Sequence, residues 1–173
     1  MSRYVFDLDN TLIETDELNN LSYNHALSLV GVSPITGFGR ITREIVFGTH
    51  TELTDFQKER IVQLKQDYFI NNINFTNPNT SLIDLLQSNS KEHCILWTSA
   101  DTKRVKGLLE YYGLKHNFIS IIYSNKKQVN EDVEKICSIF CCDSSQLLFF
   151  EDDTNVIKAL KLLGYNVKTA LFC

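Results

Sequence analysis

Two different rhythms of apolar and polar residues divide the chain. From residue 78 onward, short continuous apolar runs alternate with segments whose apolar residues recur every three or four positions. Continuous apolar runs are typical of strands buried on both faces of a parallel sheet, and the periodic segments are typical of amphipathic helices that cover such a sheet. The pattern therefore predicts an α/β fold with a three-layer core, a parallel sheet between two layers of helices.

The expected elements follow one another in a regular order. We expect strands at 3–8, 94–99, 118–123, 147–151 and 167–172, and helices at 81–87, 103–112, 131–140 and 155–163. Gly113 and Gly164 stand directly after two of these helices, where glycine is favoured because it adopts a left-handed backbone easily.

Residues 15–77 show helical periodicity alone. Thr54 with Gln57 three residues later has the form of a capping box, which predicts the start of a long helix there. The strand before this segment and the strands after it are expected to share one sheet. Residues 15–77 are therefore predicted to be an all-helical insertion in a core made of 1–14 and 78–173.

Composition and charge narrow the possible functions. The chain has 173 residues, 43% of them hydrophobic, which is enough for one domain with a modest insertion. The net charge of -4 argues against a dedicated nucleic-acid binder, because phosphate neutralisation needs clustered basic residues. No 18-residue apolar window and no signal-peptide pattern are present, so we expect a cytoplasmic protein with no membrane partner. The five cysteines form no CxxC pair, and Cys137 and Cys141, four apart on an expected helix, are interpreted as buried thiols and not as zinc ligands.

Polar residues gather at the expected carboxyl ends of the strands, which is where open parallel sheets bind ligands. The candidates are Asp7, Asp9, Thr98, Ser99, Lys126, Lys127, Glu151, Asp152 and Asp153. Crowded carboxylates repel one another, and a divalent cation relieves that repulsion. The all-oxygen ligand set predicts Mg2+, which keeps coordination positions for waters and a phosphate.

The candidates fall into four groups, one at the end of each of four expected strands. Taken in order, these four strand-end stations resemble those of the haloacid dehalogenase superfamily. The resemblance is carried by "DLDNT", by the hydroxyl residue that closes the run in "ILWTSA", by a lysine in "NKKQVNEDVEKI" and by the acids of "FFEDDTN". It implies a Rossmann-like core with a small helical cap at 15–77, as in the subgroup of phosphoglycolate phosphatase and β-phosphoglucomutase. It also implies Mg2+-dependent hydrolysis of a small phosphorylated metabolite.

The resemblance assigns roles to individual residues. Asp7 would be the nucleophile that forms an aspartyl-phosphate, and Asp9 would be the general acid and base. The metal would be held by Asp7, by the backbone carbonyl of Asp9 and by Asp152. Thr98 would hydrogen-bond the phosphoryl oxygens, and Lys127 would neutralise charge on the nucleophile and the phosphate.

Some assignments stay open. Lys127 is preferred to Lys126 from its register alone, and Asn10 and Ser99 are further candidates for binding the phosphate. Many family members carry another aspartate four residues after the metal ligand, where this chain has Val156. The second acid is therefore left as either Glu151 or Asp153.

Two other functions are compatible with parts of this pattern. A phosphomutase of the β-phosphoglucomutase type would use a histidine of the first cap helix, and the matching position here is Asn19, with His25 further along. A non-catalytic binding module with the same fold is the second alternative. The intact set of Asp7, Asp9, Lys127 and Asp152 argues against it, because buried like charges are costly to keep.

Overall fold

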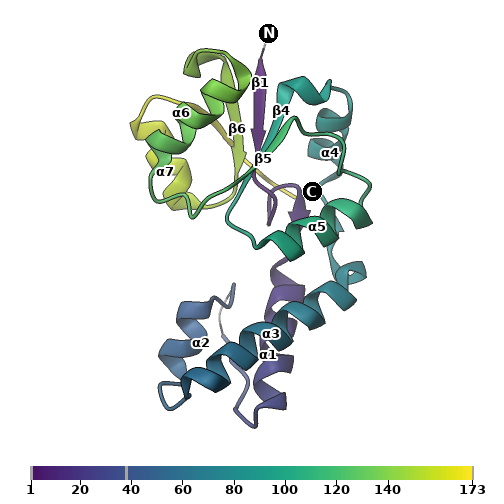
Figure 1. Ribbon diagram of the computed structural model, residues 1–173, viewed down its shortest axis with the longest axis vertical. Coiled ribbons are helices and arrows are strands. Elements are labelled where there is room, and N and C mark those ends of the chain that lie inside the picture. Colours follow the sequence, from purple (N-terminus) through teal and green to yellow (C-terminus); the bar gives the residue numbers. More distant parts are fainter. Residues whose placement is uncertain (1, 38, 173) are drawn as a thin grey trace. The chain divides into compact units, whose positions relative to one another are not determined.

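The computed structural model describes residues 2–37 and 39–172. The chain divides into two compact units (Figure 1): a core unit, Met1–Glu14 with Pro78–Cys173, and a helical unit, Thr15–Asn77. Within the described residues, none of the helices combines the length and the apolar character that a membrane crossing requires.

The core unit is built on a five-stranded parallel sheet with the strand order β5-β4-β1-β6-β7. Its strands are β1 (Arg3–Phe6), β4 (Cys94–Thr98), β5 (Ser120–Tyr123), β6 (Leu147–Glu151) and β7 (Asn166–Thr169). In the central strand, Val5 lies opposite Ile95 of β4 and Phe149 of β6. The strands β2 (Ile13–Glu14) and β3 (Asn77–Pro78) pair in a separate two-stranded sheet.

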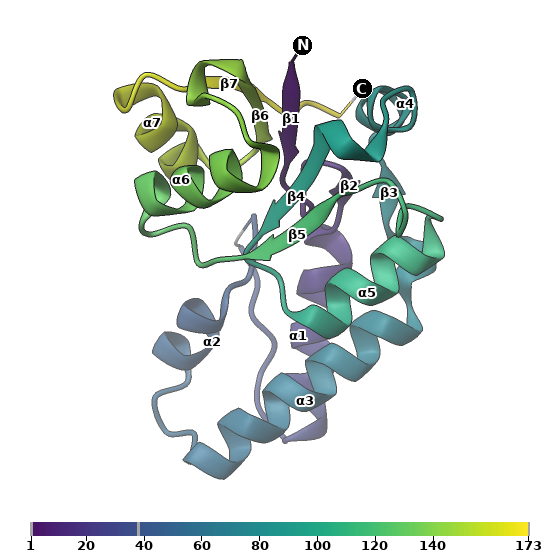
Figure 2. The same cartoon turned by 45° about the horizontal axis from the view of Figure 1, so that its top comes forward.

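Helices cover both faces of the five-stranded sheet (Figure 2). They are α4 (Thr80–Gln87), α5 (Thr102–Tyr111), α6 (Val129–Phe140) and α7 (Thr154–Leu162), and short 3-10 turns lie at Lys91–His93 and Ser144–Gln146. Helices α6 and α7 pack on one face, where Val133, Ile136 and Leu160 join a buried cluster with Trp97 and Phe149 of the strands. Helices α4 and α5 lie on the other face. The expected α/β fold with a parallel sheet between helical layers is confirmed.

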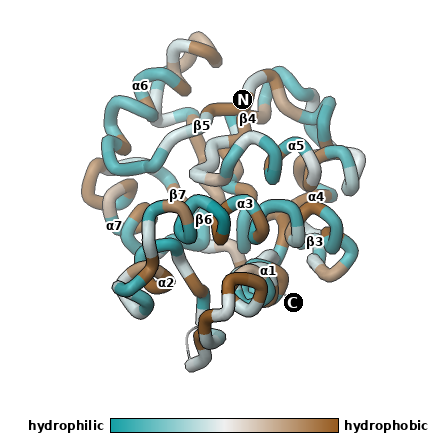
Figure 3. The backbone as a smooth tube through the Cα atoms, turned by 60° about the horizontal axis from the view of Figure 1, so that its bottom comes forward, coloured by the Kyte–Doolittle hydropathy of each residue, from teal (hydrophilic) through white to brown (hydrophobic). Residues whose placement is uncertain are grey.

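The helical unit contains α1 (Asp16–Leu29), α2 (Arg43–Thr49) and α3 (Asp55–Asn71), followed by a 3-10 turn at Ile73–Phe75. The Gln57 N–H donates to Thr54 Oγ1 at 3.3 Å and the Thr54 N–H donates to Gln57 Oε1 at 3.0 Å, which confirms the capping box. Hydrophobic and hydrophilic residues alternate along these helices (Figure 3), as expected for amphipathic helices. The apolar faces of these helices form a buried cluster that includes Tyr23, Leu27 and Ile61.

The first strand is shorter than expected. It was predicted to reach Leu8, but it ends at Phe6. The Leu8 carbonyl accepts N–H groups from Leu12 and Ile13, both at 3.0 Å, so the chain turns before Leu8 can continue the strand. As a result, Asp7 is the first residue beyond β1.

Candidate active site

The turn after β1 places Asp7 and Asp9 at the carboxyl edge of the sheet. The Asp7 N–H still donates to the Phe150 carbonyl of β6 at 3.0 Å, which fixes its backbone. Asn10 then adopts a left-handed conformation with a φ of 55°, and its N–H donates to the Ile13 carbonyl at 2.6 Å. Asparagine tolerates this conformation better than most residues. Asp7 and Asp9 are both buried by the turn, and Asn10 is half-buried.

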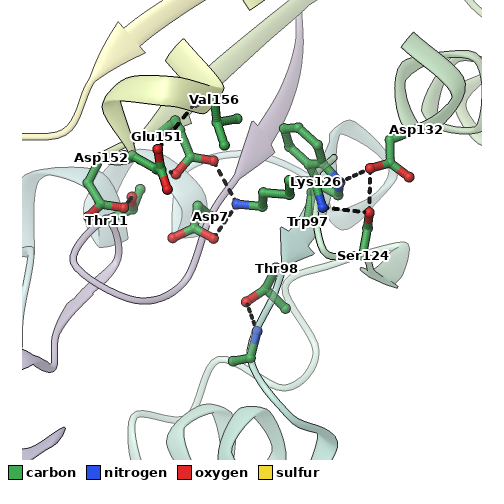
Figure 4. Close-up of polar contacts among 12 residues, drawn as sticks. Asp7, Thr11, Trp97, Thr98, Ser124, Lys126, Asp132, Glu151, Asp152 and Val156 are labelled. Carbon is green, nitrogen blue, oxygen red and sulfur yellow. Dashed lines mark hydrogen bonds and ion pairs between the residues drawn. The ribbon is translucent and has the colours of Figure 1, made fainter. Parts of the chain in front are cut away.

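Lys126 joins the ends of β1 and β6 (Figure 4). Its Nζ donates to Asp7 Oδ1 and to Glu151 Oε2, each at 2.6 Å, and its side chain is buried. Lys127, which the register favoured, is exposed, and its N–H donates to Asn125 Oδ1. The φ of Lys126 is 57°, so the backbone reverses at this residue and turns Lys126, not Lys127, toward Asp7. The sequence assignment is corrected accordingly.

The acidic run after β6 has three different environments. Glu151 Oε1 accepts the N–H groups of Asp152 and Asp153 at 3.2 Å each, while its Oε2 is held by Lys126. Asp153 is exposed and caps helix α7, because its Oδ1 accepts the N–H groups of Asn155 and Val156. Of the two candidates for a second acid, Glu151 therefore faces Asp7, whereas the Asp153 carboxylate is used to cap helix α7.

Three carboxylates could hold a metal ion. Asp7, Glu151 and Asp152 each offer an oxygen, and these three oxygens all lie within 4.8 Å of one another. Asp152 Oδ1 is also 3.5 Å from the hydroxyl of Thr11, which is fully buried in the same turn as Asp7. A set made only of carboxylate oxygens suits a hard divalent cation and would not suit a thiol-preferring one.

The two hydroxyl candidates after β4 differ in burial. Thr98 is the last residue of the strand and is 1% exposed, and its Oγ1 accepts the Ala100 N–H at 3.1 Å. Ser99 is exposed. Thr98 is therefore fixed at the strand end, and its contact with a phosphate stays a prediction.

Arg104 is a charged residue of this edge that sequence reasoning missed. Its Nη2 lies 2.6 Å from Asp9 Oδ1, and both side chains are buried. Asp101 caps helix α5 by accepting the Arg104 N–H, which places Arg104 in the first turn. One signal was available in the sequence: Arg104 stands four residues before Leu108, so it shares the buried face of an amphipathic helix.

Burial and crowding shift the ionisation of this site. Burial raises the pKa of Asp7 to about 6, with added repulsion from Asp9 and Asp152, although the Lys126 ammonium acts in the opposite direction. Burial and the Asp7 charge raise the pKa of Glu151 to about 8, against the attraction of Lys126. Burial lowers the pKa of Lys126, but Asp7 and Glu151 outweigh it and raise that pKa. Asp7 and Glu151 therefore share one ammonium, and a divalent cation held beside Asp7 would relieve the repulsion between the carboxylates.

The mutase-related positions make contacts inside the helical unit. Asn19 is buried, and its Nδ2 donates to the Ile41 carbonyl at 2.8 Å. His25 is exposed, with its ring centroid 4.2 Å from that of Tyr68. These contacts are local to α1, α3 and the segment before α2.

A comparison of the sequence with protein-family models agrees with the arrangement of residues at the strand ends. A family model described as haloacid dehalogenase-like hydrolase matches residues 4–170. The chain belongs to this family. The resemblance drawn from the four strand-end stations is confirmed, and the protein is a hydrolase of the haloacid dehalogenase type. No curated protein matches the sequence.

Solved structures of haloacid dehalogenase-like proteins share this fold. A predicted phosphoglycolate phosphatase from Haemophilus somnus is 20% identical with a TM-score of 0.79, over 98% of this chain and 84% of that chain. CbbY from Rhodobacter sphaeroides, solved in complex with phosphate, is 17% identical with a TM-score of 0.79, over 99% and 87%. A CbbY mutant in complex with xylulose-1,5-bisphosphate is 16% identical with a TM-score of 0.78, over 99% and 87%. At these identities the likeness establishes the Rossmann-like fold of this hydrolase.

Proposed function

We propose that this hydrolase is a Mg2+-dependent phosphatase that cleaves a small phosphomonoester through an aspartyl-phosphate on Asp7. The observation that carries the proposal is the pairing of the buried Asp7, the first residue after β1, with a buried ammonium. Lys126 Nζ lies 2.6 Å from Asp7 Oδ1, where it can stabilise charge on the nucleophile and on an incoming phosphoryl group. Membership of a hydrolase family supports the reaction type.

In the first step, a carboxylate oxygen of Asp7 attacks phosphorus and forms a P–O bond. The bond between phosphorus and the ester oxygen breaks, and the leaving oxygen takes a proton from the Asp9 carboxyl group. Thr98, buried at the end of β4, hydrogen-bonds a phosphoryl oxygen. The products of this step are the alcohol and the aspartyl-phosphate.

In the second step, Asp9 acts as the base. Its carboxylate takes a proton from a water molecule whose oxygen attacks phosphorus on the side opposite Asp7. The bond between phosphorus and the Asp7 oxygen breaks, which releases inorganic phosphate and restores the Asp7 carboxylate. Arg104, 2.6 Å from Asp9 Oδ1, keeps this carboxylate in place between the two steps.

The residues that would hold Mg2+ are Asp7, Asp152 and the backbone carbonyl of Asp9. Bound Mg2+ would neutralise phosphoryl charge and orient the phosphate. Both oxygens of Glu151 are already engaged, one by Lys126 and the other by two backbone N–H groups. Glu151 therefore supports Lys126 and stands outside the proposed ligand set.

The proposed substrates are small phosphorylated metabolites. Two proteins with this fold carry the names phosphoglycolate phosphatase and CbbY, the latter solved with phosphate and with xylulose-1,5-bisphosphate. A test panel should therefore contain phosphoglycolate, sugar monophosphates and sugar bisphosphates. The role of residues 15–77 as a cap that selects among them stays a prediction.

The experiment follows the covalent intermediate. With p-nitrophenyl phosphate and Mg2+, the Asp9→Asn variant should gain the mass of one phosphoryl group at Asp7 after acid quenching. This is expected because p-nitrophenolate leaves with little protonation, whereas the attacking water still needs a base. Asp7→Asn should gain no such mass and should hydrolyse no ester.

The matched control is Asp55→Asn, which changes an exposed aspartate in the first turn of α3. It should turn over at the rate of the unchanged protein. Absence of hydrolysis across the whole panel, with the fold intact, would overturn the proposal. Isomerisation that depends on a bisphosphate activator would instead identify a phosphomutase.

A further inference from the structure

The backbone of Lys126 is held in a conformation that a lysine seldom adopts. Its φ of 57° lies in the left-handed region, which is uncommon for residues other than glycine. Such a conformation persists when neighbouring groups fix it. Here the Lys126 N–H donates to Ser124 Oγ at 3.0 Å, so the side chain of Ser124 closes the turn that follows β5.

One carboxylate oxygen fixes Ser124 in turn (Figure 4). The Ser124 hydroxyl donates to Asp132 Oδ2 at 2.5 Å, and the Trp97 Nε1–H donates to the same oxygen at 3.1 Å. Asp132 belongs to the first turn of α6, and Trp97 to β4. A single acceptor therefore joins a helix, a strand and the turn that carries Lys126.

The other end of Lys126 is also in contact with this group. Its Nζ lies 4.7 Å from the centroid of the Trp97 ring, within the range of a cation–π interaction. Trp97 is 1% exposed, so its ring is a fixed surface. Ser124 thus holds the backbone of Lys126, Trp97 holds the ammonium group, and Asp132 holds both Ser124 and Trp97.

We propose that Asp132, Ser124 and Trp97 form a positioning network that keeps the Lys126 ammonium against Asp7. The proposal rests on the proposed phosphatase function. These three residues act through Lys126, so they are positioning residues. The competing explanation is that Asp132 only stabilises helix α6, whose first turn holds two acidic residues, Glu131 and Asp132.

The first test compares Asp132→Ala with Glu131→Ala. Both changes remove an acidic group from the first turn of α6. Among the contacts of the described residues, however, the exposed Glu131 carboxylate accepts a hydrogen bond only from the Gln128 side chain. Asp132→Ala should lower kcat for p-nitrophenyl phosphate about 10- to 100-fold, because a displaced ammonium no longer fits the transition state. The Mg2+ concentration for half-maximal activity should not change, and Glu131→Ala should leave kcat unchanged.

Conservative variants separate geometry from charge. Asp132→Asn keeps an oxygen that can accept both hydrogen bonds, so it should retain most of the kcat that Asp132→Ala loses. Ser124→Ala keeps Asp132 and the α6 terminus intact but frees the Lys126 N–H, and it should lower kcat in the same direction. Ser124→Ala also serves if Asp132→Ala does not fold.

A second readout is independent of turnover. Trp97 is the single tryptophan of the chain, so the intrinsic tryptophan fluorescence comes from the ring beside Lys126. Adding beryllofluoride with Mg2+, which mimics a phosphorylated aspartate, should change this emission in the unchanged protein and in Glu131→Ala. The change should shrink in Ser124→Ala.

The outcomes are distinguishable. If the unchanged protein hydrolyses p-nitrophenyl phosphate, and Asp132→Ala or Ser124→Ala matches it in kcat and in the fluorescence response, the positioning network is wrong. If the unchanged protein hydrolyses no ester but its fluorescence still responds to beryllofluoride and Ser124→Ala does not, the proposed function fails and the network stands.

Discussion

Two buried cations at the carboxyl edge of the sheet hold carboxylates in different ways. Lys126 lies 2.6 Å from both Asp7 and Glu151, and we refer to these three residues as the Lys126 cluster. Arg104 lies 2.6 Å from Asp9, and we refer to these two as the Arg104 pair. All five side chains are buried, but the first group has two carboxylates for one cation and the second has one for one.

In the Lys126 cluster two carboxylates face one ammonium, whereas in the Arg104 pair one carboxylate faces one guanidinium. In the Lys126 cluster, the pKa of Asp7 is raised to about 6 and that of Glu151 to about 8, because burial disfavours two carboxylates beside one ammonium. Asp152 adds a further carboxylate within 4.8 Å. A divalent cation is therefore expected beside the Lys126 cluster, where Asp7 and Asp152 would hold it, and the Arg104 pair is expected to work without one.

The largest effect should come from removing the cation of the Lys126 cluster. Lys126→Met keeps most of the side-chain volume but leaves Asp7 and Glu151 facing each other without a positive charge. We expect kcat for p-nitrophenyl phosphate to fall about 1,000-fold, the range for losing a group that stabilises charge in a transition state. The free energy of unfolding, measured with urea, should fall by about 3–5 kcal/mol.

Lys127→Met discriminates between the two lysines. Lys127 is exposed, and its backbone N–H, which methionine keeps, donates to Asn125 Oδ1. Its kcat should therefore match that of the unchanged protein, and its stability should change by no more than about 0.5 kcal/mol. If Lys127→Met lost activity and Lys126→Met did not, Lys127 would be the functional lysine, as the sequence analysis expected.

A smaller effect is expected from the Arg104 pair. Arg104→Met removes the guanidinium that contacts the buried Asp9 carboxylate, so this carboxylate should shift relative to the reacting oxygen. We expect kcat to fall about 100-fold, as is typical when a catalytic group is misplaced. Arg104→Lys keeps the charge but loses the planar fork, so it should recover only part of that loss.

The neighbouring variant Lys103→Met provides the control, because Lys103 is exposed in the same helical turn. It should behave as the unchanged protein does. Equal kcat values for Arg104→Met and Lys103→Met would show that the Arg104 pair has no part in turnover and is only structural.

The same comparison shows what sequence could and could not predict. The order of strands and helices, the helical segment and the carboxylates after β1 and β6 follow from apolar runs and helical period, which are local signals. Asp7, Asp9 and Thr98 stand at or just beyond strand ends, so the end of a buried run locates them. Asp7 of the Lys126 cluster was therefore visible in the sequence, whereas Lys127 was preferred to Lys126 and Glu151 was left open beside Asp153.

The rest depended on backbone turns and on packing. Lys126 is selected over Lys127 by a left-handed residue, and no glycine marks that position. Leu8 lies outside β1 because its carbonyl is used by the turn, although its side chain is as buried as that of a strand residue. Arg104 lies on a helix face that a charged residue seldom occupies unless it is paired, and its partner Asp9 is distant in sequence.

A further prediction concerns pH, and it tests the charge balance of the Lys126 cluster directly. Asp7 and Glu151 have folded-state pKa values raised to about 6 and about 8, from ordinary values of 3.8 and 4.5. Between the ordinary and the raised pKa, the folded protein holds protons that the unfolded chain has lost. Raising the pH through this range therefore destabilises the metal-free protein. Lys126, whose pKa is raised from 10.5, stays charged in both states there.

Between pH 6 and pH 8, the free energy of unfolding of the metal-free protein should fall by about 2 kcal/mol, measured by urea titration in EDTA. Glu151→Gln removes the group with the higher pKa, so its stability should change much less over the same range. Added Mg2+, held by Asp7 and Asp152, would offset the negative charge that the cluster gains on deprotonation, so it should raise the stability of the unchanged protein more at pH 8 than at pH 6. Equal stability at pH 6 and pH 8 without metal would mean that Lys126 alone balances both carboxylates. The Lys126 cluster would then be as balanced as the Arg104 pair, and the expectation of a cation there would lose its electrostatic basis.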